Sequence, residues 1–273
     1  MGKTIGLIAG SGRLPHVILD EARRSGFRVA VCAIEGETDS SISAFGDIST
    51  WVRLGQLGRL MKFFKDQGVK EAVMAGKITK TNLLKGDIRP DFEMMKVLAK
   101  ARNHSDDSLL GGIADHMSER GLRLLDSTAF LTEEALPGVG VLTKRKPTKG
   151  ETLDIEFGWR LAKEMGRLDI GQTVVVKNQA ILAVEAIEGT DQAILRGGIL
   201  GSGGVTVVKI AKPRQDMRFD VPAVGPATLN ALIQAKARVL AFEAKRTILI
   251  DRKEFVERAE RHKIAVVAKE NSI

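Results

Sequence analysis

The residues best suited to catalysis are concentrated in one stretch of the chain, residues 209–222. In an extended chain successive side chains alternate, so Asp216, Arg218 and Asp220 are expected on one face of this stretch. The stretch also contains three further cations, Lys209, Lys212 and Arg214. A solvated edge strand would explain the alternation but not this crowding of cations. Carboxylates that hold Mg²⁺ beside cations that bind phosphate oxygens are typical of phosphoryl-transfer sites, so the stretch predicts chemistry on a phosphate group.

A second group of polar residues comes shortly before this stretch. Glu185 interrupts the apolar run 181–187, and Glu188-Gly189-Thr190-Asp191 follows directly. Asp169-Ile170-Gly171-Gln172 stands upstream of the same run. Each residue also has an ordinary structural explanation, because Glu185 could face solvent on a strand and Thr190 or Asp191 could cap a helix. The residue types alone leave both explanations open.

Two glycine-containing turns are expected at strand ends in the first half of the chain. Gly10-Ser11-Gly12 separates the first apolar run from the first amphipathic one, so its backbone amides could approach an anion. A turn needed only for chain reversal is the alternative, and Pro15 occupies the position of the third glycine in a dinucleotide-binding fingerprint. Ala75-Gly76-Lys77 ends the fourth expected strand. In a doubly wound sheet Lys77 would therefore lie near the first turn.

The elements that would position these residues in the first half follow a regular alternation. Short apolar runs alternate with amphipathic runs, which is typical of βα units that feed a parallel sheet. Strands are expected at residues 4–9, 28–33, 48–52, 71–75 and 123–126. Helices are expected at residues 15–25, 56–67, 92–101 and 108–120. This pattern predicts the α/β class.

The second half begins after a break in the pattern. Leu136-Pro137-Gly138 and the basic run 144–147 favour a connection, which places a domain boundary near Leu136 and predicts domains 1–135 and 136–273. Helices are expected at residues 151–165, after Asp191 (a short one), after Pro226 and at 253–262. Strands are expected at 172–176, 180–186, 205–210, 239–242, 247–250 and 264–268, with the first two joined as a hairpin by residues 177–179. The second domain is therefore expected to be α/β with a mixed sheet.

Composition excludes several classes of protein. The chain has 273 residues, of which 44% are hydrophobic, so it can bury a core without covalent crosslinks. A single cysteine, Cys32, and four scattered histidines argue against disulfides, thiol catalysis and zinc, and they favour a reducing compartment. The sequence contains neither an apolar run long enough to span a bilayer nor a signal-peptide pattern. The net charge of +8 predicts an anionic partner without identifying it.

With these residues in view, the chain resembles the LpxI family of UDP-2,3-diacylglucosamine pyrophosphatases. The resemblance is ordered along nearly the whole length and does not depend on one motif. It runs through Gly6-Leu7-Ile8-Ala9-Gly10-Ser11-Gly12, Gly36-Glu37-Thr38-Asp39, Leu54-Gly55-Gln56-Leu57-Gly58, Ala75-Gly76-Lys77-Ile78, Asp106-Asp107-Ser108-Leu109-Leu110, Leu168-Asp169-Ile170-Gly171-Gln172, residues 183–191, residues 212–216 and residues 220–225. The blocks Glu188-Gly189-Thr190-Asp191 and Asp220-Val221-Pro222 are the most specific.

The resemblance implies a fold and an activity. The fold would pair an N-terminal Rossmann-like domain with a distinct C-terminal α/β domain, with the lipid product bound between them and two copies forming a homodimer. The activity would be cleavage of the UDP-linked diacylated sugar into UMP and 2,3-diacylglucosamine 1-phosphate (lipid X) for lipid A synthesis. It would require Mg²⁺ or Mn²⁺. The family's catalytic aspartate matches Asp220. A cytoplasmic location is expected, which is compatible with peripheral contact with the inner membrane.

These expectations assign roles to individual residues. Asp220 and Asp216 are predicted to be catalytic, as carboxylates that bind metal or position water, and Glu185 and Asp191 are further metal candidates. The residues predicted to bind substrate are Gly10, Ser11, Gly12, Ala75, Gly76, Lys77, Gln172, Thr190, Lys209, Lys212 and Arg218. Lys209 and Lys212 would bind the pyrophosphate.

Two other functions compete with this interpretation. An NAD(P)-dependent oxidoreductase would suit the opening strand, turn and helix, but the chain has no tyrosine and Pro15 departs from the fingerprint. A module without catalysis that binds nucleic acid, or that binds a nucleotide as a regulator, would suit the positive charge. Nucleic acid is not expected as a partner, because the sequence shows neither aromatic stacking platforms nor a recognition helix.

Overall fold

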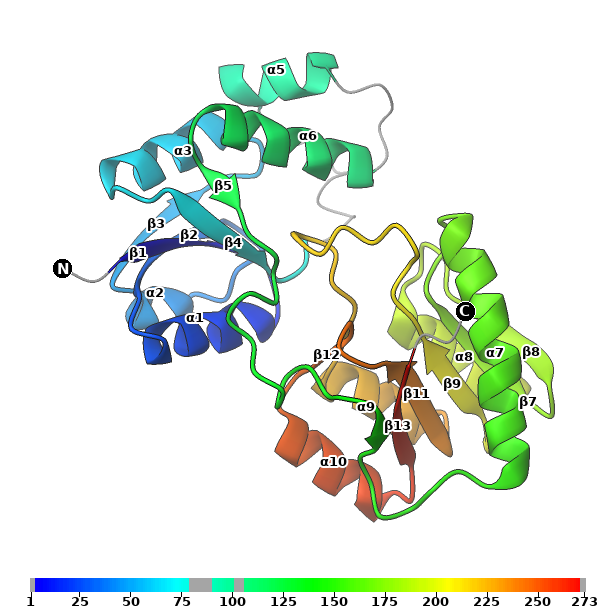
Figure 1. Cartoon of the computed structure of the whole chain (residues 1–273). Helices are drawn as coiled ribbons and strands as arrows, with labels where there is room; N and C mark the ends of the chain where they lie inside the picture. The colour runs from blue at the N-terminus through cyan, green and yellow to red at the C-terminus, as the bar shows by residue number, and fades with distance from the viewer. Residues whose placement is uncertain (1–2, 79–89, 101–105, 271–273) are drawn as a thin grey trace. The chain divides into compact units, whose positions relative to one another are not determined.

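The computed structural model describes residues 3–78, 90–100 and 106–270, with the backbone alone for residues 106–108 (Figure 1). The chain forms two compact units. The first comprises Met1–Leu131 and Asp216–Asp220, and the second comprises Thr132–Gln215 and Val221–Ile273. A short segment of the second half of the sequence therefore belongs to the first unit.

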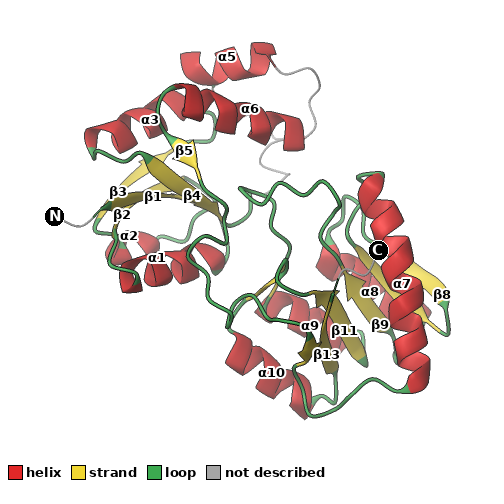
Figure 2. Cartoon of the chain, in the orientation of Figure 1, coloured by secondary structure: helices red, strands yellow, loops and turns green. Residues whose placement is uncertain are grey.

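The first unit is built on a parallel five-stranded sheet in the order β3-β2-β1-β4-β5. Its elements are β1 (Thr4–Ala9), α1 (Leu14–Arg24), β2 (Arg28–Ile34), α2 (Ile42–Phe45), β3 (Ile48–Val52), α3 (Leu57–Asp66), β4 (Glu71–Ala75), α5 (Phe92–Lys100), α6 (Asp106–Glu119) and β5 (Arg123–Leu124). Helices α1 and α2 cover one face, and α3, α5 and α6 cover the other (Figures 1 and 2). Because both faces are buried, β1 and β2 consist of nearly continuous apolar residues.

The second unit contains a mixed six-stranded sheet in the order β6-β13-β11-β9-β7-β8. Its elements are β6 (Gly140–Val141), α7 (Lys149–Arg167), β7 (Thr173–Lys177), β8 (Ala180–Val184), α8 (Thr190–Leu200), β9 (Thr206–Lys209), β10 (Ala223–Val224), α9 (Pro226–Gln234), β11 (Val239–Glu243), β12 (Ile248–Leu249), α10 (Arg252–Arg261) and β13 (Ala265–Lys269). Helix α7 packs on one core and α8 on another, on opposite faces of this sheet. Strands β10 and β12 pair separately.

The α/β class, the parallel first sheet and the mixed second sheet are confirmed. The predicted hairpin is β7–β8, and its turn residues Asn178 and Gln179 have φ angles of 52° and 57°. Two consecutive left-handed residues suit the twist of a tight hairpin, and the Asp154 carboxylate accepts hydrogen bonds from both of their N–H groups. The short elements α2, β6 and β10 were not predicted. The expected end of a helix at Ala101 lies outside the described residues.

Helix α7 begins at Lys149, two residues before the expected start, and a capping box marks this end. The hydroxyl of Thr148 accepts a hydrogen bond from the Glu151 N–H, and the Glu151 carboxylate accepts one from the Thr148 N–H. This reciprocal capping box satisfies two amides that the helix cannot pair itself.

Across the described ranges, the helices are too short or too polar to cross a membrane.

Candidate active site

The two predicted glycine turns of the first unit are hydrogen-bonded to each other. The N–H of Gly10 donates to the Ala75 carbonyl (2.7 Å), and Ser11 and Lys77 exchange backbone hydrogen bonds of 2.8 and 3.0 Å. The Ser11 hydroxyl donates to the Lys77 carbonyl as well, at 2.8 Å. Because β1 and β4 are neighbouring parallel strands, both turns lie at the carboxyl edge of the sheet, where α/β proteins commonly bind ligands. The expected proximity of Lys77 to the first turn is therefore observed.

Glycine is required where the turns meet. Gly76 has a φ of +92°, and a Cβ atom there would lie 2.6 Å from the Ser11 carbonyl oxygen. A Cβ atom on Gly10 would lie 2.7 Å from the Lys77 carbonyl oxygen. Side chains at these positions would push the turns apart, so the glycines serve close backbone approach. Helix α1 starts just beyond, and no described side chain caps its first amides.

Residues 216–220 form a tight turn, so the expected extended conformation is wrong. The Asp216 carboxylate accepts the Arg218 N–H (3.0 Å), and the Asp216 carbonyl accepts the Asp220 N–H (3.1 Å). The first bond forms an Asx-turn, in which an aspartate side-chain oxygen takes the place of a backbone carbonyl and accepts the N–H two residues later. Asp216, Arg218 and Asp220 are consequently not arranged along one face of a strand.

Arg218 is bound to Asp216 by its side chain too. Its Nε lies 3.0 Å from Asp216 Oδ1 and its Nη2 lies 2.7 Å from Oδ2. This fork lowers the pKa of Asp216, and the Arg218 N–H bond to its carboxylate adds to the effect. Arg218 also lies 3.9 Å from Asp115 on α6. Arg218 pairs with both of these carboxylates and therefore helps to shape the turn. This role is additional to its predicted contact with substrate.

Ser127 connects this turn to the sheet, and no motif in the sequence distinguished it. Its N–H donates to the Met217 carbonyl at 2.8 Å. Its hydroxyl oxygen lies 2.7 Å from the Met74 carbonyl oxygen and 2.8 Å from that of Arg218. Met74 precedes Ala75, so hydrogen bonds connect the glycine turns to the turn that carries Asp220.

A second group of predicted residues meets at the start of α8 in the second unit. The Lys209 ammonium donates to the Thr190 hydroxyl (2.6 Å), which donates to Glu185 Oε1 (2.9 Å). Thr173 at the start of β7 connects these residues. It pairs with Lys209 at the end of β9, and its carbonyl accepts the N–H of Glu185, which follows β8. Glu185 and Lys209 are only 8% and 3% exposed. The structure thus gathers Glu185, Thr190 and Lys209 into one buried polar cluster.

The position of Lys209 is unfavourable for a purely structural lysine. The N-terminal end of a helix carries partial positive charge, and burial also disfavours an ammonium group. Lys177 provides the contrast, since its ammonium donates to the Gly201 and Gly203 carbonyls at the C-terminal end of the same helix. There the helix dipole favours a cation. Lys209 and the helix amides together form a region that would attract an anion.

Several buried oxygens around this cluster have no hydrogen-bond partner within the described part of the chain. They are Oε2 of Glu185, Oδ1 of Asp191, Oγ1 of Thr173 and Oε1 of Gln172. Buried polar atoms are nearly always paired, so a group of unpaired ones is a place where a polar ligand could bind. Thr173 was not selected from the sequence because a single threonine in an apolar strand has no distinguishing context.

Lys212 lies in the loop after β9, and its ammonium bonds to Asp169 at 2.6 Å. A buried ion pair holds the start of this loop. Glu243 Oε2 accepts hydrogen bonds from the Lys163 ammonium (2.7 Å) and from the Ala211 N–H (2.8 Å). Both side chains are under a tenth exposed, so this pair fixes the backbone directly before Lys212.

The four carboxylates predicted to bind metal are divided between the two units. Asp216 and Asp220 belong to the first unit, whereas Glu185 and Asp191 belong to the second. Within residues 3–78, 90–100 and 109–270, no three His, Cys, Asp or Glu side chains are placed to hold an ion together. Asp216 fits a metal poorly because Arg218 occupies both of its oxygens. Glu185 and Asp191 fit better, since each keeps one buried oxygen without a partner.

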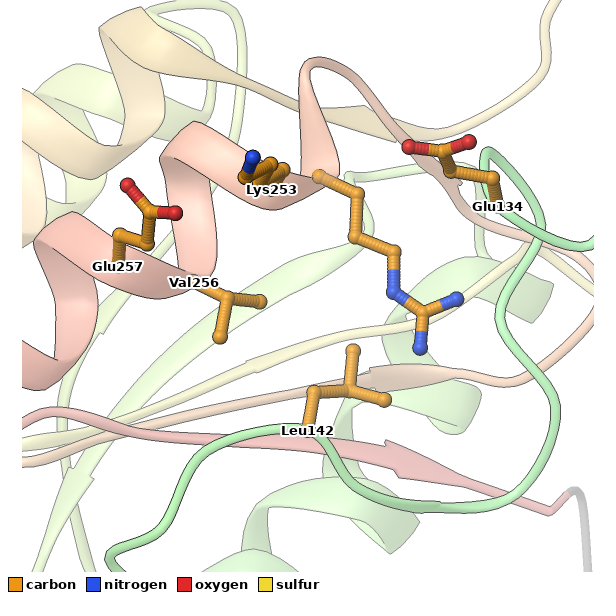
Figure 3. A pocket seen from close by; sticks show the side chains of 6 residues that line it. Glu134, Leu142, Lys253, Val256 and Glu257 are labelled. Carbon is orange, nitrogen blue, oxygen red and sulfur yellow. The ribbon is translucent and has the colours of Figure 1, made fainter.

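A surface pocket of about 460 Å³ in the second unit lies apart from the predicted residues (Figure 3). It is lined by Glu134, Leu142, Arg252, Lys253, Val256 and Glu257. Its acidic and basic side chains balance, and none of them was predicted to act on a substrate. The pocket therefore adds nothing to the candidate site.

Both halves of the sequence match models of known domains. Residues 4–134 match the LpxI N-terminal domain, and residues 138–267 match the LpxI C-terminal domain. A protein of Caulobacter vibrioides named UDP-2,3-diacylglucosamine pyrophosphatase LpxI is 30% identical over 270 residues, which cover 94% of each chain. This chain belongs to the LpxI family. The resemblance noted from the motifs is confirmed, and the two polar groups described above are therefore features of an LpxI fold.

Solved structures resemble this LpxI chain only weakly. A UDP-glucose-4-epimerase of Stenotrophomonas maltophila has 12% identity and a TM-score of 0.30, with 44% of this chain and 34% of that chain covered. A glycinamide-RNase-transformylase T of Mycobacterium tuberculosis has 12% identity and a TM-score of 0.27, with 67% and 44% covered. The chain thus spans less than half of each of these proteins. TM-scores this low do not establish a common fold.

Proposed function

We propose that this protein hydrolyses the pyrophosphate bond of UDP-2,3-diacylglucosamine to UMP and 2,3-diacylglucosamine 1-phosphate, in lipid A synthesis. The observation that carries the proposal is membership of the LpxI family, with a relative named for this activity aligned over 94% of both chains. The two polar groups support it, because each contains the residue types that phosphate chemistry requires.

In the first unit, Asp220 is proposed to position the attacking water and to accept its proton. The water oxygen forms a bond to one phosphorus, and the bridging bond from that phosphorus to oxygen breaks. Asp220 ends a turn that Asp216 and Arg218 hold in place, so its backbone is fixed before substrate binds. The amides after Gly12 and the exposed ammonium of Lys77 would bind substrate oxygens at the same sheet edge.

In the second unit, Lys209 and the first amides of α8 are proposed to bind anionic oxygens of the substrate. The hydroxyl of Thr190 holds the ammonium in place, and Glu185 accepts from that hydroxyl. An oxyanion would offset the burial of Lys209 at the positive end of the helix. Gln172 and Lys212 are proposed as further substrate contacts, the latter after release from Asp169.

Mg²⁺ or Mn²⁺ is proposed as the cofactor. When bound, the ion would neutralise the pyrophosphate and polarise the phosphorus–oxygen bonds under attack. Glu185 and Asp191 would hold it through the oxygens that lack partners. Asp220 is a separate candidate ligand in the first unit. The oxygen ligands are the kind that Mg²⁺ prefers.

A homodimer in the cytoplasm, in peripheral contact with the inner membrane, is also proposed. The family resemblance supports the dimer, and an acylated substrate supports the membrane contact. Light scattering at a mass near twice 29.6 kDa would support the dimer, and a mass near 29.6 kDa at all concentrations would refute it. Sedimentation with vesicles of anionic phospholipid would test the membrane contact.

The decisive experiment incubates purified protein with UDP-2,3-diacylglucosamine and Mg²⁺ and measures UMP and the lipid product by mass spectrometry. Both products should appear, and reaction in ¹⁸O-labelled water should label one of them and so identify the attacked phosphorus. UDP-glucose, which has no acyl chains, serves as the substrate control. The Asp220→Asn variant excludes a contaminating enzyme. Absence of both products from correctly folded protein with Mg²⁺ or Mn²⁺ would refute the proposed function.

A further inference from the structure

We propose that Ser127 is a positioning residue for this hydrolysis, which fixes the turn carrying Asp220 by linking the Met217–Arg218 backbone to β4. The expected kinetic effects depend on the proposed function, whereas the contacts of Ser127 are independent of it. Ser127 follows β5, at the same carboxyl edge as the two glycine turns. It belongs to the first unit, as do residues 216–220.

Ser127 makes its contacts in two directions. Towards the turn, its N–H donates to the Met217 carbonyl and its hydroxyl reaches the Arg218 carbonyl. Towards the sheet, the same hydroxyl reaches the carbonyl of Met74 in β4. The hydroxyl has one proton, so the two carbonyls share it as a donor. A single side chain therefore joins a central strand to the turn at a point two residues before Asp220.

Burial makes this link difficult to replace with water. Ser127 is 3% exposed, so its hydroxyl is shielded from solvent in the folded chain. Removal of the hydroxyl would leave the Met74 and Arg218 carbonyls without that donor, and a buried acceptor without a donor is unfavourable. The turn is expected to shift until water or another donor satisfies them.

The turn should survive this change as a folded structure. The Asp216 carboxylate still holds the Arg218 N–H and guanidinium, and the Ser127 N–H to Met217 bond does not depend on the side chain. Phe219 still packs against the core under α3, α5 and α6. Loss of the hydroxyl should thus displace Asp220 without unfolding its surroundings, which distinguishes positioning from general stabilisation.

The test compares Ser127→Ala with Ser25→Ala. Ser25 is the control, since its hydroxyl also donates to a backbone carbonyl, that of Glu21, but at the exposed far end of α1 in the same unit. Ser127→Ala is expected to lower kcat by roughly 10-fold to 100-fold, because a displacement of about 1 Å at a reacting group can cost about that much. KM should change by less than about threefold, since substrate binding is retained. Ser127→Thr keeps the hydroxyl and should recover most of kcat.

Amide hydrogen exchange of residues 216–220 gives a readout that does not depend on activity. Exchange there should be faster in Ser127→Ala than in wild type or Ser25→Ala, with unchanged exchange in β1. Unchanged exchange in residues 216–220, or a kcat equal to that of Ser25→Ala, would overturn the proposal. If Ser127→Ala does not fold, Ser127→Cys replaces it, because a thiol keeps the size but is a weak donor. If wild type shows no hydrolysis, the proposed function fails, and exchange alone decides whether Ser127 positions the turn.

Discussion

The ammonium of Lys209 lies 2.6 Å from the hydroxyl oxygen of Thr190, the first residue of α8. A cation is least favoured at that end of a helix, and Lys209 is also buried. Glu185 accepts a hydrogen bond from the same hydroxyl, so the ammonium lies in a buried polar cluster beside the first amides of the helix, where an anionic ligand would be favoured. The relationship between these two residues is thus the strongest physical argument for an anion site in the second unit.

Lys209→Met should reduce kcat/KM by roughly 100-fold or more, because the buried ammonium contributes to binding a doubly charged pyrophosphate. Methionine keeps most of the volume but leaves the buried Glu185 carboxylate without a nearby ammonium, so the melting temperature should fall and the kinetics are compared on the folded fraction. Lys177→Met is the matched control, since that lysine binds the other end of α8. It should lower Tm but leave the kinetics of the folded fraction intact. Equal kinetic losses in the two variants would remove Lys209 from the site.

Asp220→Asn should lower turnover by on the order of 100-fold or more while substrate affinity and Tm change little, because the carboxylate acts mainly in the transition state. Asparagine keeps the size and most hydrogen bonds and removes the charge. Steady-state kinetics and thermal melting of the same preparation measure both effects. A folded Asp220→Asn protein with hydrolysis near that of wild type would return Asp220 to a structural role in the turn.

The Asp216–Arg218 pair predicts a particular dependence of stability on pH. Arg218 holds the pKa of Asp216 below its usual value, so the pair stabilises the folded state above the unfolded pKa of about 3.9. That stabilisation is lost as the pH falls through the lower folded-state pKa. The Tm difference between wild type and Asp216→Asn should therefore be constant from about pH 7 to about pH 5 and shrink below about pH 4. A difference that instead grows on acidification would contradict the assigned contact.

The dependence of hydrolysis on metal should be due to the carboxylates of the second unit. Chelation should abolish hydrolysis and Mg²⁺ should restore it. Glu185→Gln and Asp191→Asn should each raise the Mg²⁺ concentration needed for half activity, whereas Asp216→Asn should not, because Arg218 already occupies the Asp216 oxygens. Titration of Mn²⁺ followed by electron paramagnetic resonance measures binding without turnover. Weaker Mn²⁺ binding in Asp216→Asn alone would place the ion in the first unit instead.

Cys32 should resist thiol reagents in the folded protein. Burial in β2 raises its pKa to about 12, so almost none of it is thiolate at neutral or mildly alkaline pH. Labelling with iodoacetamide should proceed only when the first sheet opens, and denaturant should accelerate it strongly. Rapid labelling under native conditions would show that β2 is not held as described.

The sequence predicted most of the elements because their signals are local. Apolar runs and intervening amphipathic runs located the strands and helices of the first sheet, and Asn178 marked a hairpin turn. The turn at residues 216–220 was mispredicted as extended, because alternation of charged and apolar side chains outweighed the turn-forming tendency of Asp216. The same aspartate could have been recognised as the start of an Asx-turn.

Local sequence patterns could not predict the contacts that complete the site. Ser127 and residues 216–220 are separated by more than eighty positions, and nothing near Ser127 in the sequence indicates a partner. Likewise the contrast between Lys177 and Lys209 depends on which end of α8 each one reaches. Residue types predicted the chemistry, whereas the three-dimensional pairing of distant segments decides which residues carry it out.

The membership of residues 216–220 in the first unit has a consequence for synthesis of the protein. A ribosome that has released residue 131 has translated the five-stranded sheet but not the turn with Asp216 and Asp220. The nascent first unit must wait for almost ninety further residues before its carboxyl edge is complete. A gene divided after Leu131 would likewise yield one fragment without these aspartates and another that carries them without the serine that binds their turn.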